Sequence, residues 1–316
     1  MIDSSGRNIE YLRLSLTQRC TLRCTYCRAA EGICPKKDEL GAAVFERLVR
    51  LLAKLGIKKV RLTGGEPMLR YDLLEIISRI CAIEGILEVT MTTNAQHLAG
   101  QAAALKKAGL SRLNISIDSL QKERYHELTG GGDIERVLLG IDEALTAGLV
   151  PLKLNTVLMR GINDDEIDTL MLLAKDRPLD IRFIELMPMG NGDCSKLRIE
   201  SSEILKTRPW LIPISPRYIS QPSVDYTAAG FKGRIGFISP VTNSFCENCN
   251  RVRITSDGLL RPCLGDDNEI SLLDALKGTD EELLEIMRRA IFFKPMGHTF
   301  CGHGLALEKD MSKIGG

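Results

Sequence analysis

The sequence carries almost no net charge, because 42 Lys and Arg residues are balanced by 41 Asp and Glu residues, a formal charge of +1. A nearly neutral chain gives no indication of binding to nucleic acid or to a membrane surface. No apolar run approaches the roughly 18 residues that a membrane-spanning helix needs, and no basic segment followed by an apolar one opens the chain. These absences predict a cytoplasmic protein with no nucleic-acid partner and no membrane partner.

Length and cysteine content narrow the class further. At 316 residues the chain is long for one ordinary domain but suits a barrel with an appendage, and its 44% hydrophobic residues are enough for a buried core. Thiols stay reduced in the cytoplasm, so the ten cysteines favour metal ligands over disulfides.

Three closely spaced thiols stand near the N-terminus, at Cys20, Cys24 and Cys27. A zinc site needs a fourth Cys or His nearby, and only Cys34 is close, since no histidine precedes His97. Three thiolates without a fourth ligand suit a [4Fe–4S] cluster with one open iron. With Tyr26 before the last cysteine, the spacing resembles the radical S-adenosylmethionine (SAM) signature, in which SAM binds the open iron through its amino and carboxylate groups.

Strand-like and helix-like stretches alternate over the first two thirds of the chain. Alternating apolar and polar residues predict strands at 11–17, 58–63, 88–93, 112–118, 151–158 and 181–186. Helical spacing predicts helices after the first five strands, at 44–55, 71–83, 99–108, 133–147 and 164–175. Strands separated by helices form a parallel sheet whose crossovers share one hand. We therefore expect an α/β fold, an incomplete (β/α)6 TIM-type barrel.

The chain beyond the barrel is expected to form a second unit. Four prolines interrupt the pattern, at Pro209, Pro213, Pro216 and Pro222. Proline lacks a backbone N–H, so we expect an irregular linker over residues 209–230. This divides the chain into a barrel domain at 1–208 and a small C-terminal α+β domain at 231–316, with an amphipathic helix at 269–292.

The polar faces of the expected strands predict a polar barrel interior. Helices outside a parallel sheet must meet the apolar strand faces, so the polar faces turn inward. The inward set comprises Arg13, Ser15, Lys59, Arg61, Thr90, Thr92, Asn114, Ser116, Asp118, Lys153 and Asn155, with Arg182 a further candidate. Buried cations without partners cost several kcal/mol each, which favours a phosphate-bearing substrate over internal salt bridges.

A glycine pair ends the second expected strand, in Gly64-Gly65-Glu66-Pro67. Alone this stretch is as typical of a simple turn as of a site. Glycines let backbone approach a ligand closely, and Glu66 is placed to accept a hydrogen bond from the SAM amino group. The stretch resembles the GGEP element of radical SAM enzymes.

A second set of three thiols stands at Cys246, Cys249 and Cys263. Zinc competes seriously with a cluster here, because short cysteine clusters are often structural zinc sites. Arg251 and Arg253 share one strand face just beyond Cys249, and this pair favours ligand recognition beside an open metal position.

The combined motifs resemble the GTP 3′,8-cyclase family, the radical SAM enzymes that open molybdenum cofactor biosynthesis, over the whole chain. Besides the elements above, the resemblance rests on residues 3–7, 92–94, 116–118, 182–188 and the final glycine pair. It implies two [4Fe–4S] clusters, one on each cysteine triplet. The SAM contacts implied are Tyr26, Gly65, Ser116 and Met187, to which Gly64 and Glu66 of the GGEP element are added. The GTP contacts implied are Arg13, Arg61, Thr92, Lys153, Arg251 and Arg253, to which the inward-facing Lys59 and Arg182 are added.

The resemblance also implies the reaction and its partners. A 5′-deoxyadenosyl radical from SAM takes a hydrogen atom from C3′ of GTP, and the C3′ radical then attacks C8. Addition of one electron from the reductant and of one proton gives (8S)-3′,8-cyclo-7,8-dihydroguanosine 5′-triphosphate, a lyase reaction. Gly315 and Gly316 are expected to reach the active site as catalytic residues. Expected partners are a flavodoxin- or ferredoxin-like reductant and a downstream cyclic pyranopterin monophosphate synthase, with the chain a monomer or homodimer.

Two alternatives compete with this interpretation. Another radical SAM enzyme with an auxiliary cluster, such as a peptide maturase, commonly has more late cysteines. A non-enzymatic iron–sulfur electron carrier would have no use for the glycine loop or the cation-lined interior. Cys34, Cys81, Cys194 and Cys301 are interpreted as free thiols. A metal site at His298 and His303 is disfavoured.

Overall fold

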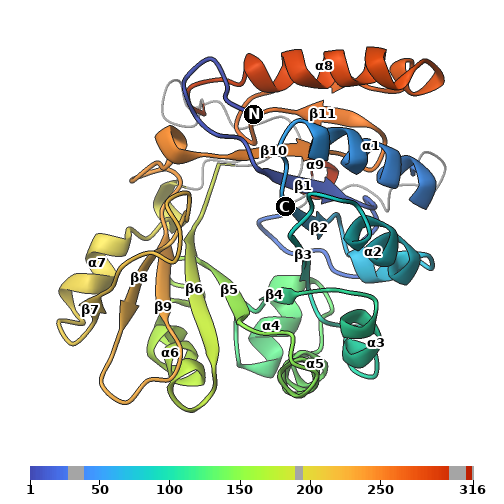
Figure 1. The fold of residues 1–316 in the computed structure, drawn as a ribbon. Helices are drawn as coiled ribbons and strands as arrows, with labels where there is room; N and C mark the ends of the chain where they lie inside the picture. Colours follow the sequence, from blue (N-terminus) through green and yellow to red (C-terminus); the bar gives the residue numbers. More distant parts are fainter. Residues whose placement is uncertain (28–38, 189–194, 299–310, 315–316) are drawn as a thin grey trace.

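Six consecutive parallel strands form the centre of the sheet, in the order β1 to β6 (Figure 1). The computed structural model describes residues 1–27, 39–188, 195–298 and 311–314. The central strands are β1 (Tyr11–Ser15), β2 (Lys59–Thr63), β3 (Glu88–Thr93), β4 (Arg112–Ser116), β5 (Leu152–Leu158) and β6 (Leu179–Glu185). Five helices connect them as expected: α1 (Ala42–Lys54), α2 (Leu73–Cys81), α3 (Ala102–Lys107), α5 (Ile134–Thr146) and α6 (Ile167–Asp176). The predicted βα alternation is confirmed.

One connecting helix, α4 (Lys122–Thr129), was not predicted from the sequence. Its mostly polar stretch lacks a clear apolar stripe, yet it buries Tyr125 and Leu128. The helix ends at Gly130, whose φ of 63° is the left-handed conformation that glycine adopts most readily. No helix among the described residues is both long and apolar enough to span a lipid bilayer.

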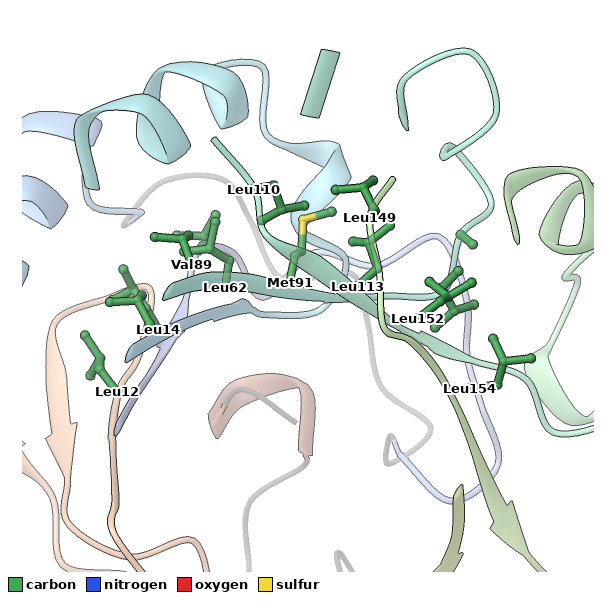
Figure 2. Close-up of a cluster of buried hydrophobic side chains, with 14 of the residues drawn as sticks. Leu12, Leu14, Leu62, Val89, Met91, Leu110, Leu113, Leu149, Leu152 and Leu154 are labelled. Atoms are coloured by element: carbon green, nitrogen blue, oxygen red, sulfur yellow. The ribbon is translucent and has the colours of Figure 1, made fainter. Parts of the chain in front are cut away.

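The apolar strand faces pack against the outer helices, as Figure 2 shows for labelled side chains that include Leu14, Leu62 and Met91. These three side chains are fully buried, and α1 adds Phe45 and Leu48 to the same core. Removing such surface from water is the main favourable term in folding. The polar faces are thereby turned to the concave side of the sheet, as predicted.

The C-terminal part of the chain extends the barrel sheet at both edges. Beyond β1 lie β10 (Arg251–Ile254), β11 (Leu259–Arg261) and β12 (Ile270–Ser271), of which β10 pairs in parallel with β1. Beyond β6 lie β9 (Ile235–Ile238), β8 (Val224–Thr227) and β7 (Ile212–Pro213), of which β9 pairs in parallel with β6. Residues from both ends of the chain therefore meet on one curved sheet.

Two expectations about this part of the chain are wrong. The proline-rich segment 209–230 is not wholly irregular, because β7 and β8 form an antiparallel pair within it. Pro213 is tolerated because β7 is the last strand of the sheet, where a missing N–H need not break a ladder. The division into domains at residue 208 stays a prediction.

The helix expected at 269–292 is shorter, since α8 covers Asp280–Phe292. A capping box sets its start: Glu282 N donates to Thr279 Oγ1 at 3.2 Å, and Thr279 N donates to the Glu282 carboxylate at 3.1 Å. Residues before the box form β12 and a 3-10 turn at Ala275–Lys277 instead.

Candidate functional site

A cavity of about 350 Å³ brings both cysteine triplets together. Its walls include Cys20, Cys24 and Cys27 from the loop after β1, and Cys246, Cys249 and Cys263 from the segments around β10 and β11. Of the other candidates, Tyr26, Gly64, Gly65, Ser116, Met187, Arg13, Arg61, Thr92, Arg182, Arg251 and Arg253 also line it. Two sites far apart in the sequence are therefore parts of one chamber.

The first triplet sits in a loop that begins where β1 ends. Cys27 N donates to the Cys24 carbonyl at 3.0 Å, and Cys20 Sγ accepts from Asn94 Nδ2 at 3.6 Å. Burial raises the pKa of the Cys24 thiol well above its usual value, and Asp118 raises it further. A metal cluster supplies the positive charge that such thiols need to lose their protons, so the donor set fits an iron–sulfur cluster.

The glycine pair allows the loop after β2 to pass close to the first cysteine loop. A Cβ on Gly64, whose φ is +148°, would lie 2.5 Å from the Thr17 carbonyl oxygen, and one on Gly65 would lie 2.1 Å from that of Arg19. Gly65 N also donates to Thr17 O at 2.7 Å. The glycines thus allow the loop after β2 to lie against the backbone of the first cysteine loop. Both glycines also line the cavity.

Glu66 is not among the residues that line the cavity, and its role as a SAM contact stays a prediction. Its carboxylate accepts from Met68 N at 3.0 Å, Thr93 Oγ1 at 2.7 Å and Asn94 N at 2.7 Å. The residue is 1% exposed, and burial raises its pKa to about 7. Glu66 therefore fastens the loop after β2 to the end of β3, beside the Asn94 that contacts Cys20.

Asp118 is a cavity residue to which sequence reasoning assigned no role beyond its inward face. Tyr26 Oη donates to Asp118 Oδ2 at 2.6 Å, and Val157 N donates to Asp118 Oδ1 at 2.9 Å. Burial raises the Asp118 pKa to about 6. This carboxyl group fixes the Tyr26 ring beside the last cysteine of the first triplet.

Three arginines stand side by side on adjacent strands of the cavity wall. Arg13 of β1 is in register with Arg61 of β2 on one side and with Arg253 of β10 on the other. Burial, together with the charges of Arg61 and Arg251, lowers the Arg13 pKa to about 10. Like charges directly opposite one another destabilise a sheet, so this row fits an anionic ligand.

Other buried polar atoms at the wall have no hydrogen-bond partner among the described residues. They are Arg182 Nε and Nη2, Arg251 Nη2, and the Oδ1 atoms of Asn114 and Asn155. An unsatisfied buried donor costs about 1–3 kcal/mol, more when it is charged. The Arg251 guanidinium also lies 4.8 Å from the ring centroid of Phe245, which holds it in place.

Two predicted substrate residues, Lys59 and Lys153, are not among the residues that line the cavity. Lys59 forms an ion pair with Glu88 and lies 5.3 and 5.2 Å from the ring centroids of Tyr11 and Tyr218. Lys153 is 1% exposed, and burial, followed by the charge of Arg182, lowers its pKa to about 6. Both stand at the N-terminal ends of their strands, away from the cysteine loops.

The second triplet is accompanied by a histidine. Cys249 N donates to the Cys246 carbonyl at 3.1 Å, and a hydrogen bond with His298 lowers the Cys246 pKa to about 7. His298 Nε2 also lies 2.7 Å from the Pro240 carbonyl oxygen and lines the cavity. Sequence reasoning missed this placement, because an isolated histidine gives no local signal. His303 lies outside the described residues.

The C-terminal segment also reaches the cavity. Helix α9 (Met311–Ile314) lies on the concave side of the sheet, opposite the labelled hydrophobic side chains of Figure 2. Met311 lines the cavity and Ile314 is 1% exposed. The predicted catalytic residues Gly315 and Gly316 lie outside the described residues, as do Cys34, Cys194 and Cys301. Cys81 is away from the cavity, and its thiol donates to the Gly109 carbonyl at 3.4 Å.

Comparisons with known proteins place the chain in a family. A profile described as the radical SAM superfamily matches residues 14–174, and one described as Molybdenum Cofactor Synthesis C matches residues 179–300. The chain is therefore a radical SAM protein, a class in which SAM binds one [4Fe–4S] cluster.

Relatives narrow the class further. The chain is 45% identical to the GTP 3′,8-cyclase of Alkaliphilus oremlandii and 41% identical to that of Petrotoga mobilis, with 100% of both chains covered in each case. It belongs to the GTP 3′,8-cyclase family. Streptococcus suis SuiB, whose structure was solved with SAM bound, matches at a TM-score of 0.60 and 16% identity, over 89% of this chain and 65% of that one. That likeness supports the fold alone.

Proposed function

We propose that this chain converts GTP into (8S)-3′,8-cyclo-7,8-dihydroguanosine 5′-triphosphate, the reaction that opens molybdenum cofactor biosynthesis. The observation that carries the proposal is the shared cavity, in which two cysteine triplets and five arginines face one chamber. The names of the relatives and the match to the Molybdenum Cofactor Synthesis C profile support the same substrate and pathway.

The first triplet is assigned to the SAM-binding cluster. When bound and reduced, that cluster and SAM supply a 5′-deoxyadenosyl radical. Cys20, Cys24 and Cys27 would ligate three of its irons, and the cavity wall beside them would hold SAM through Tyr26, Gly65, Ser116 and Met187. Asp118 orients Tyr26, and Glu66 secures the loops, so the residues at this end position SAM and exclude water.

The arginine row is assigned to the triphosphate. Arg13, Arg61 and Arg253 occupy neighbouring register positions, and a polyphosphate has the negative charge and spaced oxygens to match them. Arg61 is steadied by Thr92, whose Oγ1 accepts from Arg61 Nη1 at 3.3 Å. Holding the triphosphate in this way fixes the ribose of GTP within the chamber, where proximity converts a bimolecular step into an intramolecular one.

The second triplet is assigned to a second [4Fe–4S] cluster beside the guanine end. Cys246, Cys249 and Cys263 would supply three ligands, and Arg251 would donate to the bound nucleotide. Zinc is the competing occupant. A flavodoxin- or ferredoxin-like reductant, a downstream cyclic pyranopterin monophosphate synthase, and a monomeric or homodimeric state complete the proposal.

The test is an anaerobic assay of reconstituted protein with SAM, dithionite and GTP. We expect 5′-deoxyadenosine and a cyclised nucleotide to form together, each dependent on GTP. Formation of 5′-deoxyadenosine without any cyclised nucleotide would retain the radical SAM assignment and reject GTP cyclisation. A Cys24→Ala variant is the matched control, because it should abolish both products.

A further inference from the structure

Arg7 is a buried arginine that uses all five of its N–H donors. Its Nε donates to Asp3 Oδ2 at 2.7 Å. Its Nη1 donates to the carbonyls of Cys246 at 3.1 Å and Met296 at 3.0 Å, and its Nη2 to those of Lys294 at 3.1 Å and Pro295 at 2.7 Å. A guanidinium has five such donors, so this one is fully satisfied.

The acceptors belong to the segments that build the second cysteine site. Cys246 is itself a candidate ligand, and Lys294, which lines the cavity, donates through Nζ to the carbonyl of Pro262, the residue before Cys263. The same 294–298 segment ends at His298, which hydrogen-bonds to Cys246. A Cβ on Gly297 would lie 3.9 Å from Cys246 Sγ, so this segment packs directly on that ligand.

Arg7 is in turn held by the N-terminal turn that carries it. Asp3 Oδ1 accepts from Arg7 N at 2.9 Å and from Ser5 N at 3.0 Å, while Asp3 is 3% exposed. A buried arginine and aspartate of this kind are costly unless each charge is paired and hydrogen-bonded. The arrangement therefore links residues 3–7 to the backbone of Cys246 and of the 294–296 segment, and Lys294 extends this link to Pro262, next to Cys263.

We propose that Arg7 is a positioning residue for the second cysteine site: its guanidinium sets the backbone of Cys246 and of the 294–296 segment so that the three thiols converge on one metal centre. The inference rests on the proposed function only for the identity of that centre. Lysine cannot replace Arg7, because one ammonium has three donors and no planar fork to reach four carbonyls and a carboxylate.

The experiment compares Arg7→Lys with a matched arginine away from the site. Arg47 also joins two segments, donating to Asp280 Oδ1 at 2.7 Å and to the carbonyls of Leu276 at 2.7 Å and Gly278 at 2.9 Å. Both variants keep the positive charge of the side chain but lose the planar set of N–H donors of the guanidinium group. Metal content, SAM affinity and GTP affinity are measured on each anaerobically reconstituted protein.

Arg7→Lys is expected to lose the metal of the second triplet, so that iron falls from about eight to about four atoms per chain. GTP affinity should fall by about tenfold or more, while SAM affinity changes less than about twofold. Arg47→Lys should keep the metal and both affinities. Retained SAM binding shows that the Arg7 variant has folded.

Full metal content and unchanged GTP affinity in Arg7→Lys would overturn the inference. Loss of SAM binding and of both metal centres would also overturn it, since the role would then be general stability. If the wild-type chain holds zinc at the second triplet, the second-cluster proposal fails, but the inference about Arg7 still predicts that this zinc is lost in the variant.

Discussion

Arg13 of β1 and Arg253 of β10 are register partners in a parallel pair of strands, although they come from opposite ends of the chain. Their guanidinium groups share a wall of the cavity, and burial lowers the pKa of each. Two like charges so placed oppose folding unless an anion neutralises them. In the function proposed above, the triphosphate of GTP would supply that negative charge.

Replacing Arg251 or Arg253 should weaken the binding of GTP but not the binding of SAM. We expect Arg251→Ala or Arg253→Ala to reduce the free energy of GTP binding by about 1.5–3 kcal/mol, the usual contribution of a charge-assisted hydrogen bond. Calorimetry with GTP and with SAM measures both affinities. Arg208→Ala, which removes an exposed ion pair with Asp168, is the control and should change neither. Equal losses of GTP and SAM affinity would point to misfolding.

The two triplets should hold two oxygen-sensitive clusters. We expect about eight iron atoms per chain after anaerobic reconstitution, and about four in a variant with all three late cysteines replaced by alanine. Metal analysis and absorbance spectra provide the measurement. Stoichiometric zinc with about four iron atoms in the anaerobically purified protein would contradict the second cluster.

A methyl group on Gly65 should disrupt the first cysteine loop. Its Cβ would lie 2.1 Å from the carbonyl oxygen of Arg19, which belongs to the backbone and not to the flexible end of a side chain. We expect Gly65→Ala to lose the first cluster and SAM binding. Gly41→Ala is the control, because a Cβ there meets nothing within 4 Å. Normal iron content in Gly65→Ala would show that the two loops can separate without consequence.

Replacing the buried amine of Lys153 with an apolar group should stabilise the ligand-free protein. Because burial lowers its pKa to about 6, the folded chain binds fewer protons here than the unfolded chain between that pH and the usual lysine value. The stability contributed by this site therefore rises with pH across the window. Lys153→Met should have a free energy of unfolding higher by on the order of 2–5 kcal/mol at pH 7, and therefore a higher unfolding temperature, and this gain should shrink as pH rises. A lower unfolding temperature would show that Lys153 has a stabilising partner.

The last two glycines should be needed for turnover more than for binding. Helix α9 brings the chain to the cavity, with Met311 on its wall and Ile314 buried just before Gly315. We expect deletion of Gly315 and Gly316 to leave both clusters, SAM binding and GTP affinity nearly intact and to abolish the cyclised nucleotide. Cluster absorbance, nucleotide affinity and product yield are measured together. Full activity without the glycines would assign them no role in the reaction.

The barrel and its polar interior were predictable because strand periodicity is local. Leu12 and Leu14 alternate with Arg13, and covering helices decide which face is apolar. The same alternation predicted that Lys59 faces inward with Arg61. Alternation predicts which face of the sheet a side chain lies on, but it does not predict how far along the barrel axis the side chain lies. Lys59 therefore faces the predicted side yet pairs with Glu88 instead of lining the cavity.

Features set by distant contacts were not predictable. Glu66 looks available for SAM in the sequence, but its three hydrogen-bond donors include Thr93 and Asn94 at the end of the next strand. Strand β7 forms despite Pro213 because it pairs only with β8 at the edge of the sheet. The placement of His298 beside Cys246 likewise depends on the return of the chain after α8, which no local pattern encodes.

The central claim is that the radical generated at the first cysteine triplet acts on the ribose of GTP held by the arginine row. The most direct measurement uses GTP deuterated at C3′ in the anaerobic reaction with SAM and dithionite, followed by mass spectrometry of 5′-deoxyadenosine. The account predicts that 5′-deoxyadenosine gains one deuterium while the cyclised nucleotide loses it. Unlabelled 5′-deoxyadenosine formed at the same rate with and without GTP would contradict the account.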